Sequence, residues 1–157
     1  MSSRTLTIAL PRLADTERLA SRIAPLLMPG DAVLLSGPIG AGKSAFARAL
    51  IRSRLGDPDV EVPSPTYTLV QTYSDGADEI WHCDLYRTGD TSELVELGLD
   101  AAFAEAITLI EWPDRLGEMA PADALQLAFA VEHAGHSVTA ELTDTWSGRL
   151  EDLLARS

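Results

Sequence analysis

The sequence predicts an α/β fold with a mixed central sheet flanked by helices, and three observations carry this prediction. A short apolar run at residues 33–36, of the length of a buried strand, leads into a glycine-rich loop. Apolar residues at helical spacing follow that loop from residue 43 onward. Antiparallel strand pairs are indicated after this helix and near the C-terminus. The 157 residues suit a single domain, 1–157, with a core of its own.

The first part of the chain is predicted to hold two strands and two helices. Residues 6–10 alternate between apolar and polar side chains, as a strand does. Asp15 or Thr16 is placed to cap a helix that runs to about residue 27. The helix after the glycine loop should run from residue 43 to about residue 55, before Gly56-Asp57-Pro58.

A strand pair and a short helix are predicted next. Residues 67–73 and 79–84 should form the pair, on either side of a turn. Thr91 or Ser92 would cap a short helix near residues 93–97, and a glycine closes that helix at position 98.

The C-terminal part is predicted to add three strands and a helix. Residues 106–110 form an apolar run typical of a buried strand. Residues 125–131 and 137–142 should form a hairpin around Ala134-Gly135. A final helix from about residue 145 to 155 has its large apolar side chains on one face.

The strongest functional signal is Gly37-Pro38-Ile39-Gly40-Ala41-Gly42-Lys43-Ser44, which matches the phosphate-binding pattern G-x-x-x-x-G-K-[ST] at every fixed position. Glycines adopt backbone angles closed to other residues, so successive N–H groups can turn inward and form an anion cradle with the helix N-terminus. Lys43 is the only lysine in the chain. We expect it in an exposed loop, reaching the β- and γ-phosphates, with the Ser44 hydroxyl as a Mg²⁺ ligand.

Two acidic residues at the ends of predicted strands are candidates to work with this loop. Glu111 follows the strand at 106–110, and Asp84 ends the strand at 79–84. His82 shares a face with Asp84 because side chains alternate along a strand. A magnesium-dependent NTPase needs a carboxylate at a strand end, which holds the metal directly or through water. These residues leave open which of the two acids contacts the metal.

A third candidate segment is Ser64-Pro65-Thr66-Tyr67. Its proline stiffens the loop, and the Thr66 hydroxyl could meet the metal or the γ-phosphate. Other NTPases use such a segment as a switch that the triphosphate orders. A plain turn is the alternative interpretation, since Ser-Pro turns are common.

Charge and composition restrict the partners and the compartment. The formal net charge of −12 opposes unaided binding to a polyanion, and the chain offers at most a local basic surface, such as Arg48, Arg52 and Arg54. No apolar run approaches the roughly 20 residues that span a bilayer, and the N-terminus lacks the apolar core of a signal peptide. We therefore expect a cytoplasmic protein without a membrane partner. Cys83 is the only cysteine, which excludes a disulfide framework and favours a small buried apolar role.

Four segments together resemble the TsaE family (formerly YjeE) of bacterial P-loop ATPases. They are, in chain order, the glycine loop, Ser64-Pro65-Thr66-Tyr67, His82-Cys83-Asp84-Leu85-Tyr86-Arg87 and Ile110-Glu111-Trp112-Pro113. The loop alone indicates only an NTPase, whereas the second and third segments make the resemblance specific. It extends from the first predicted strand to the C-terminal hairpin.

The resemblance implies a magnesium-dependent ATPase, weak alone, that supports synthesis of threonylcarbamoyladenosine at position 37 of tRNA. It implies TsaB and TsaD as partners: TsaD carries the transferase chemistry, the ATPase resets the TsaB–TsaD pair between turnovers, and tRNA is met only through the complex. Ser44 and Glu111 would bind Mg²⁺, and Thr66 and Asp84 would be needed for hydrolysis. The implied ATP-binding residues are Gly37, Pro38, Ile39, Gly40, Ala41, Gly42, Lys43, Ser44, Ala45 and His136.

The chain departs from the family pattern at four places. Pro38 stands where the family usually has Asp, Ser44 where Thr is commoner, and Ala45 where a second hydroxyl is frequent. In the C-terminal hairpin, Gly135-His136 replaces the Gly-Arg that the family tends to place near the nucleotide. If His136 takes that role, its positive charge depends on pH; a solvent-exposed turn histidine is the alternative.

The residues alone leave two other functions open. A small-molecule kinase could use the same loop, but such enzymes usually add an arginine-rich lid, and only Arg87 lies between Asp84 and Arg115. A nucleotide-sensing module with negligible turnover is the second alternative, which the two strand-end acids disfavour. Transfer to candidate acceptors and phosphate release would separate these functions.

Overall fold

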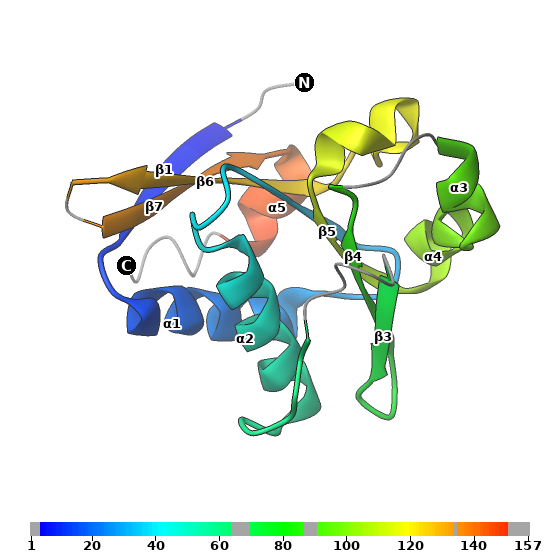
Figure 1. Cartoon of the computed structure of the whole chain (residues 1–157), viewed down its shortest axis with the longest axis horizontal. Coiled ribbons are helices and arrows are strands. Elements are labelled where there is room, and N and C mark those ends of the chain that lie inside the picture. Colours follow the sequence, from blue (N-terminus) through cyan, green and yellow to red (C-terminus); the bar gives the residue numbers. More distant parts are fainter. Residues whose placement is uncertain (1–3, 64–69, 87–90, 134, 151–157) are drawn as a thin grey trace.

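Seven strands form one mixed sheet in the described part of the chain, in the order β1-β7-β6-β2-β5-β4-β3 (Figure 1). The computed structural model describes residues 4–63, 70–86, 91–133 and 135–150. The strands are β1 (Arg4–Leu10), β2 (Ala32–Ser36), β3 (Val70–Ser74), β4 (Glu79–Asp84), β5 (Ile107–Glu111), β6 (Leu125–Glu132) and β7 (Gly135–Leu142). The helices are α1 (Leu13–Ile23), α2 (Lys43–Leu55), α3 (Thr91–Glu96), α4 (Leu99–Glu105) and α5 (Asp144–Arg149), with 3₁₀ turns η1 (Ala24–Leu26) and η2 (Pro113–Met119).

The centre of the sheet is parallel and its two sides are antiparallel. β2 lies between β5 and β6 and is parallel to both, and β4 is parallel to β5. β3 pairs antiparallel with β4, β6 with β7, and β1 with β7. The predicted α/β class, the mixed sheet and both antiparallel pairs are confirmed. Because β2, β4 and β5 are parallel, their carboxyl ends meet at one edge of the sheet.

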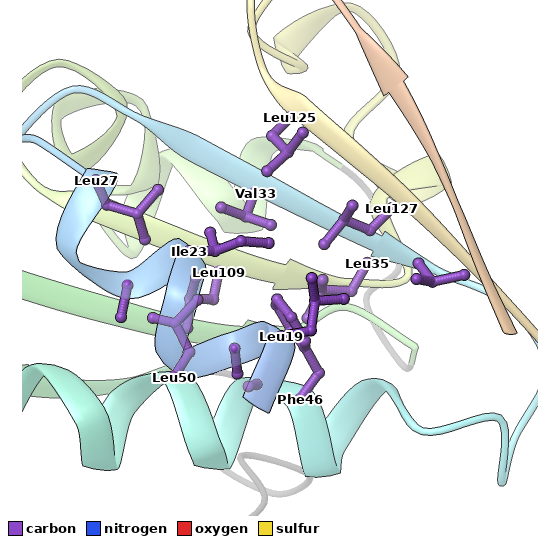
Figure 2. Close-up of a cluster of buried hydrophobic side chains, with 14 of the residues drawn as sticks. Leu19, Ile23, Leu27, Val33, Leu35, Phe46, Leu50, Leu109, Leu125 and Leu127 are labelled. Atoms are coloured by element: carbon purple, nitrogen blue, oxygen red, sulfur yellow. The ribbon is translucent and has the colours of Figure 1, made fainter. Parts of the chain in front are cut away.

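Apolar side chains cover both faces of this sheet. Val33 and Leu35 of β2 face α1 and α2, where they pack with Phe46 and Leu50 of α2 (Figure 2). Leu34, the residue between them, belongs to the cluster on the opposite face, which includes residues of α3 and α4. This alternation follows from the period of two along a strand. Helices thus flank the sheet as predicted.

Cys83 of β4 lies in the cluster on the α3–α4 face and is fully buried. Burial raises the pKa of its thiol to about 12, because the thiolate would lose its hydration there. The expectation of a small buried apolar side chain is confirmed.

The first helix begins earlier than predicted and ends earlier too. α1 starts at Leu13, so neither Asp15 nor Thr16 is its cap. Asp15 instead lies in the first turn, where its carboxylate accepts the Arg12 backbone N–H at 3.0 Å. The α-helix stops at Ile23, and Pro25, which lacks a backbone N–H, lies in the 3₁₀ turn that follows. Helix α2, in contrast, has the predicted bounds and ends at a left-handed Gly56.

The later elements differ from the predictions mainly at their ends. β3 begins at Val70 in the described residues, while 64–69 lie outside them, and β5 is shifted by one residue to end at Glu111. α3 begins at Thr91, so this residue is helical instead of a cap, and Gly98 closes the helix as predicted. Helix α4, which Gly98 also starts, was not predicted. α5 ends at Arg149, and 151–157 lie outside the described residues.

The arginines of α2 do not form a free basic surface. Arg54 is mostly buried and pairs with Asp75 at 2.9 Å and Asp78 at 2.8 Å in the β3–β4 turn. It also donates to two backbone carbonyls near the end of α1. Arg52 donates to the carbonyl of Val60 at 3.0 Å. These arginines therefore secure local structure, and the basic surface suggested by the sequence is smaller than three residues.

Candidate functional site

A cavity of about 570 Å³ lies at the edge of the sheet where β2, β4 and β5 end. It brings together most of the residues that the sequence singled out: the second half of the glycine loop, both strand-end acids and the hairpin histidine. Its lining consists of Ile39, Gly40, Gly42, Lys43, Ser44, Ala45, Asp84, Tyr86, Glu111, Trp112 and His136. Gly37, Pro38 and Ala41 belong to the same loop but are not among the lining residues. Thr66 and the rest of its segment lie outside the described residues.

The glycine loop joins the end of β2 to the start of α2 through three left-handed glycines. Gly37, Gly40 and Gly42 have φ values of 129°, 84° and 109°. A Cβ at Gly37 would also lie 2.4 Å from the backbone oxygen of Phe129 in β6, so only glycine fits there. At Gly40, by contrast, no atom lies within 4 Å of such a Cβ. The loop therefore passes closely over β6 and then opens toward the cavity.

The N-terminus of α2 faces this cavity, and its N-cap residue offers no side chain to accept hydrogen bonds from the free backbone N–H groups. Gly42 is its N-cap and makes no side-chain capping bond, and the first turn contains no acidic residue. The first N–H groups of a helix have no partner within the helix, and the helix dipole adds partial positive charge there. This end of α2 is therefore suited to an anion such as a phosphate.

Lys43 is buried, with 5% of its surface exposed, and the prediction of an exposed lysine is wrong. Its Nζ donates to the carbonyl of Gly37 at 2.5 Å and lies 3.5 Å from the centroid of the Trp112 ring. The ring and the loop together shield the ammonium from water. Desolvation lowers the pKa of Lys43, and the charges of Glu111, Asp84 and Asp114 oppose this effect.

Glu111 is the buried centre of the polar contacts in the cavity. Its Oε1 accepts the Ser44 hydroxyl at 3.0 Å, and its Oε2 lies 2.7 Å from Nε2 of His82. Two carboxylate oxygens thus have two different partners, one on α2 and one on β4. The contact to Ser44 joins residues 67 positions apart, which the sequence had paired only as expected metal ligands.

Asp84 lies beside Glu111 at the same edge of the sheet. The two residues are register partners across β4 and β5. Asp84 is half-buried, and one of its carboxylate oxygens accepts the backbone N–H of Tyr86 at 3.1 Å. The cavity wall therefore carries two carboxylates against one lysine ammonium, which favours a cation close to the Ser44 hydroxyl.

The donor set in this wall fits Mg²⁺ better than a metal held by protein ligands alone. The described residues contain no group of three or more His, Cys, Asp or Glu side chains arranged to hold a metal ion. Mg²⁺ is bound through one or two carboxylates together with phosphates and water. A hydroxyl and a carboxylate in contact, next to a helix N-terminus, are compatible with that kind of site.

His136 of β7 contacts the glycine loop directly. Its Nε2 lies 3.0 Å from the carbonyl oxygen of Gly40. The hairpin histidine is therefore placed at the mouth of the cavity, and it is not a turn residue remote from the loop. This position is compatible with contact to a bound nucleotide, which stays a prediction.

Trp112 was not identified as a site residue from the sequence. It has a left-handed backbone, with φ 61° and ψ 56°, which is uncommon for a bulky residue. Its backbone N–H donates to the backbone carbonyl of Leu35 in β2, and its ring packs against that of Tyr86 with centroids 4.9 Å apart. The signals in the sequence were its position directly after Glu111 and its place in the segment Ile110-Glu111-Trp112-Pro113, on which the resemblance partly rests.

The comparison with known proteins identifies the family. Residues 10–138 match the sequence model of the family described as "Threonylcarbamoyl adenosine biosynthesis protein TsaE". The chain belongs to the TsaE family. The resemblance seen in the sequence is thus confirmed, and the chain has the TsaE role in biosynthesis of tRNA threonylcarbamoyladenosine.

Several TsaE proteins are similar over most of this chain. A tRNA threonylcarbamoyladenosine biosynthesis protein TsaE from Bacillus subtilis is 35% identical over 141 residues, covering 89% of this chain and 85% of that protein. The TsaE protein of Rickettsia felis is 33% identical, covering 91% and 83%. The crystal structure of Bacillus subtilis YdiB superposes with a TM-score of 0.75 at 24% identity, covering 99% and 96% of the two chains. That structural likeness supports the fold alone.

In the part of the chain that the structure describes, every helix is too short or too polar to cross a bilayer.

Proposed function

We propose that this TsaE chain is a Mg²⁺-dependent ATP-binding and ATP-hydrolysing subunit that supports tRNA N6-threonylcarbamoyladenosine formation by TsaB and TsaD. The observation that carries the proposal is the 3.0 Å contact between the Ser44 hydroxyl and Glu111, next to the buried Lys43 ammonium. A phosphate-binding loop, a metal-binding hydroxyl and a strand-end carboxylate are the parts that phosphoryl-transfer sites combine.

Each part has a separate role in the proposal. Lys43 and the N–H groups at the start of α2 bind the phosphates, and Ser44 and Glu111 hold the metal. Mg²⁺ supplies charge neutralisation at the phosphates when it is bound. Asp84, on the neighbouring strand, faces the same cavity and serves hydrolysis, as does Thr66, whose segment lies outside the described residues. ATP, as opposed to another nucleotide, comes from the family resemblance.

Lys43 must change partners when a nucleotide binds. Its ammonium donates to the Gly37 carbonyl and lies against Trp112, and phosphate oxygens would replace these contacts. The ammonium is already desolvated, so binding to phosphate does not add the full cost of removing it from water. The hydrogen bonds that the ammonium then forms to ionised phosphate oxygens are stronger than its present bond to the neutral carbonyl of Gly37.

The charge of the chain supports an indirect contact with tRNA. The formal net charge is −12, and Arg52 and Arg54 of α2 already bind backbone carbonyls or carboxylates. A polyanion gains its affinity from basic groups that neutralise phosphates. We therefore assign tRNA binding to the partner proteins, TsaB and TsaD, and nucleotide binding to this chain.

Phosphate release in the presence and absence of the partners tests this function. The chain alone should hydrolyse ATP slowly, and addition of both TsaB and TsaD should raise the rate. Thr66→Ala should reduce this rise, while Thr72→Ala, which removes an exposed hydroxyl from β3, should leave it unchanged. Weak tRNA binding by the chain alone at physiological salt is expected in parallel.

Three results would contradict the proposal in different ways. Turnover by the chain alone as fast as by the assembly would favour an autonomous enzyme. Transfer of the γ-phosphate to a small acceptor would favour a kinase. Nucleotide binding with negligible phosphate release in every combination would favour a nucleotide-sensing module.

A further inference from the structure

His82 is a buried histidine in contact with Glu111, and the sequence leaves its function open. It lies on β4, and its side chain and that of Glu111 are only 2% and 3% exposed. Its Nε2 is 2.7 Å from Oε2 of Glu111, which makes this contact shorter than the one between Glu111 and Ser44. His82 is not among the residues that line the cavity, so it reaches the site only through Glu111.

The strand register explains why these two side chains meet. Ile80, His82 and Asp84 alternate onto one face of β4, and Ile80 belongs to the core cluster on the α1–α2 side. Leu109 and Glu111 lie on the same face of β5, with Leu109 opposite His82 in the register. His82 therefore forms the polar layer between the apolar core and the two carboxylates of the cavity. It supports Glu111 through Oε2, while Oε1 accepts the Ser44 hydroxyl.

The direction of the hydrogen bond follows from the chemistry of the pair. An ionised carboxylate only accepts, so Nε2 of His82 must carry the hydrogen. The other ring nitrogen, Nδ1, is buried and has no hydrogen-bond partner among the described residues. A ring with hydrogen on Nε2 alone leaves Nδ1 with a lone pair instead of an unsatisfied donor. The surroundings thus favour one tautomer, which points its N–H at Glu111.

Stability alone does not account for a polar pair at this place. Apolar residues of similar volume often stabilise a core as well as, or better than, a buried ionic pair does. The apolar residues Ile80 and Leu109 already pack around this layer. A histidine instead fixes the orientation of the Glu111 carboxylate, because its Nε2 holds Oε2 and Oε1 then faces Ser44.

We propose that His82 is a positioning residue, which holds the Glu111 carboxylate in the orientation that presents Oε1 to Ser44 and to a Mg²⁺–nucleotide. This inference rests on the proposed function, since it assumes that Glu111 and Ser44 hold the metal. Outer partners of a metal-binding side chain fix its orientation, and their loss typically weakens metal binding or activity by about 10- to 100-fold. His82 would act in this way without touching metal or nucleotide.

A pair of amide variants separates positioning from packing. Glutamine carries its amide nitrogen at about the distance of Nε2 and can still donate to Glu111, whereas the asparagine amide is too short. We would compare His82→Gln and His82→Asn in the full-length chain with a non-hydrolysable ATP analogue. The quantity measured is the gain in nucleotide affinity when Mg²⁺ replaces EDTA.

The expected result is loss of that gain in one variant only. His82→Asn should lose about 10- to 100-fold of the Mg²⁺-dependent gain, and should keep its affinity in EDTA. His82→Gln should retain most of the gain. Ile80→Ala, a buried change on the same face of β4, is the matched control: it should lower the melting temperature and leave the gain intact.

The contradicting results are distinguishable from failure of the proposed function. A wild-type gain with an equal gain in His82→Asn would overturn the positioning role alone. An equal loss in Ile80→Ala would overturn it too, because the effect would then come from packing. Absence of any gain in wild type would contradict the metal site itself, and the inference with it.

A measurement on the unmodified chain covers the case in which the variants do not fold. Nitrogen-15 NMR of the imidazole rings reports which nitrogen carries hydrogen, and His133→Gln and His136→Gln assign the other two histidines. The inference requires hydrogen on Nε2 of His82. A ring protonated only on Nδ1 would overturn it.

Discussion

Replacing Glu111 by Gln should reduce ATP hydrolysis, measured with TsaB and TsaD, by about 100- to 1000-fold, the range seen when one electrostatic contact to a reacting group is lost. Nucleotide affinity in Mg²⁺ should fall by less, by about the 10- to 100-fold that a correctly placed Glu111 contributes to the Mg²⁺-dependent gain. The substitution keeps the size of the side chain and removes its charge. It also conflicts with one of the two neighbours, because the amide NH₂ would face either the Ser44 hydroxyl hydrogen or the His82 N–H.

Single-turnover phosphate release and equilibrium nucleotide binding separate these two effects. Glu105→Gln removes an exposed carboxylate from α4 and serves as the control, with wild-type rates expected. Asp84→Asn should also reduce hydrolysis more than binding, since Asp84 lies beside Glu111 in the sheet register. An acid whose amide variant hydrolyses ATP like wild type has only a structural role.

Replacing Lys43 by Ala should weaken ATP binding by about 10- to 100-fold, which corresponds to the 1.5–3 kcal/mol of a hydrogen bond to a charged group. The fold should remain, because α2 keeps its left-handed glycine caps and its apolar face. Lys43→Arg should restore the charge but not the affinity, since a planar guanidinium does not replace a compact ammonium.

Nucleotide titration and thermal unfolding of the same samples check this prediction. Arg48→Ala, on the next turn of α2, is the control for loss of a positive charge on this helix. Wild-type affinity in Lys43→Ala would contradict the phosphate-binding assignment of the whole loop. Lost affinity together with a lost unfolding transition would show a structural lysine instead.

The glycine loop and its flanking elements were predictable because they depend on local sequence. The fixed glycines and the helical spacing after Lys43 define the loop and α2 without reference to the rest of the chain. The alternation along β4 likewise placed His82 and Asp84 on one face. The loop follows from its fixed glycines, and the faces of α2 and β4 follow from the periods of a helix and a strand.

The contacts of the site were less predictable because they join distant segments. Lys43 is buried by Trp112, whose left-handed backbone no local pattern indicated. His82 meets Glu111 because β4 and β5 are neighbours, and strand order is not encoded in the period of either strand. Helix α4 is short and follows α3 directly across Gly98, so neither length nor a polar cap distinguished it.

A crystal structure of the chain with Mg²⁺ and a non-hydrolysable ATP analogue tests the central claim most directly. The account predicts the β- and γ-phosphates against the glycine loop and the start of α2, with Lys43 moved from the Gly37 carbonyl to phosphate oxygens. It predicts the metal next to Ser44 and Glu111. A nucleotide bound elsewhere, or a metal that approaches neither residue, would contradict it.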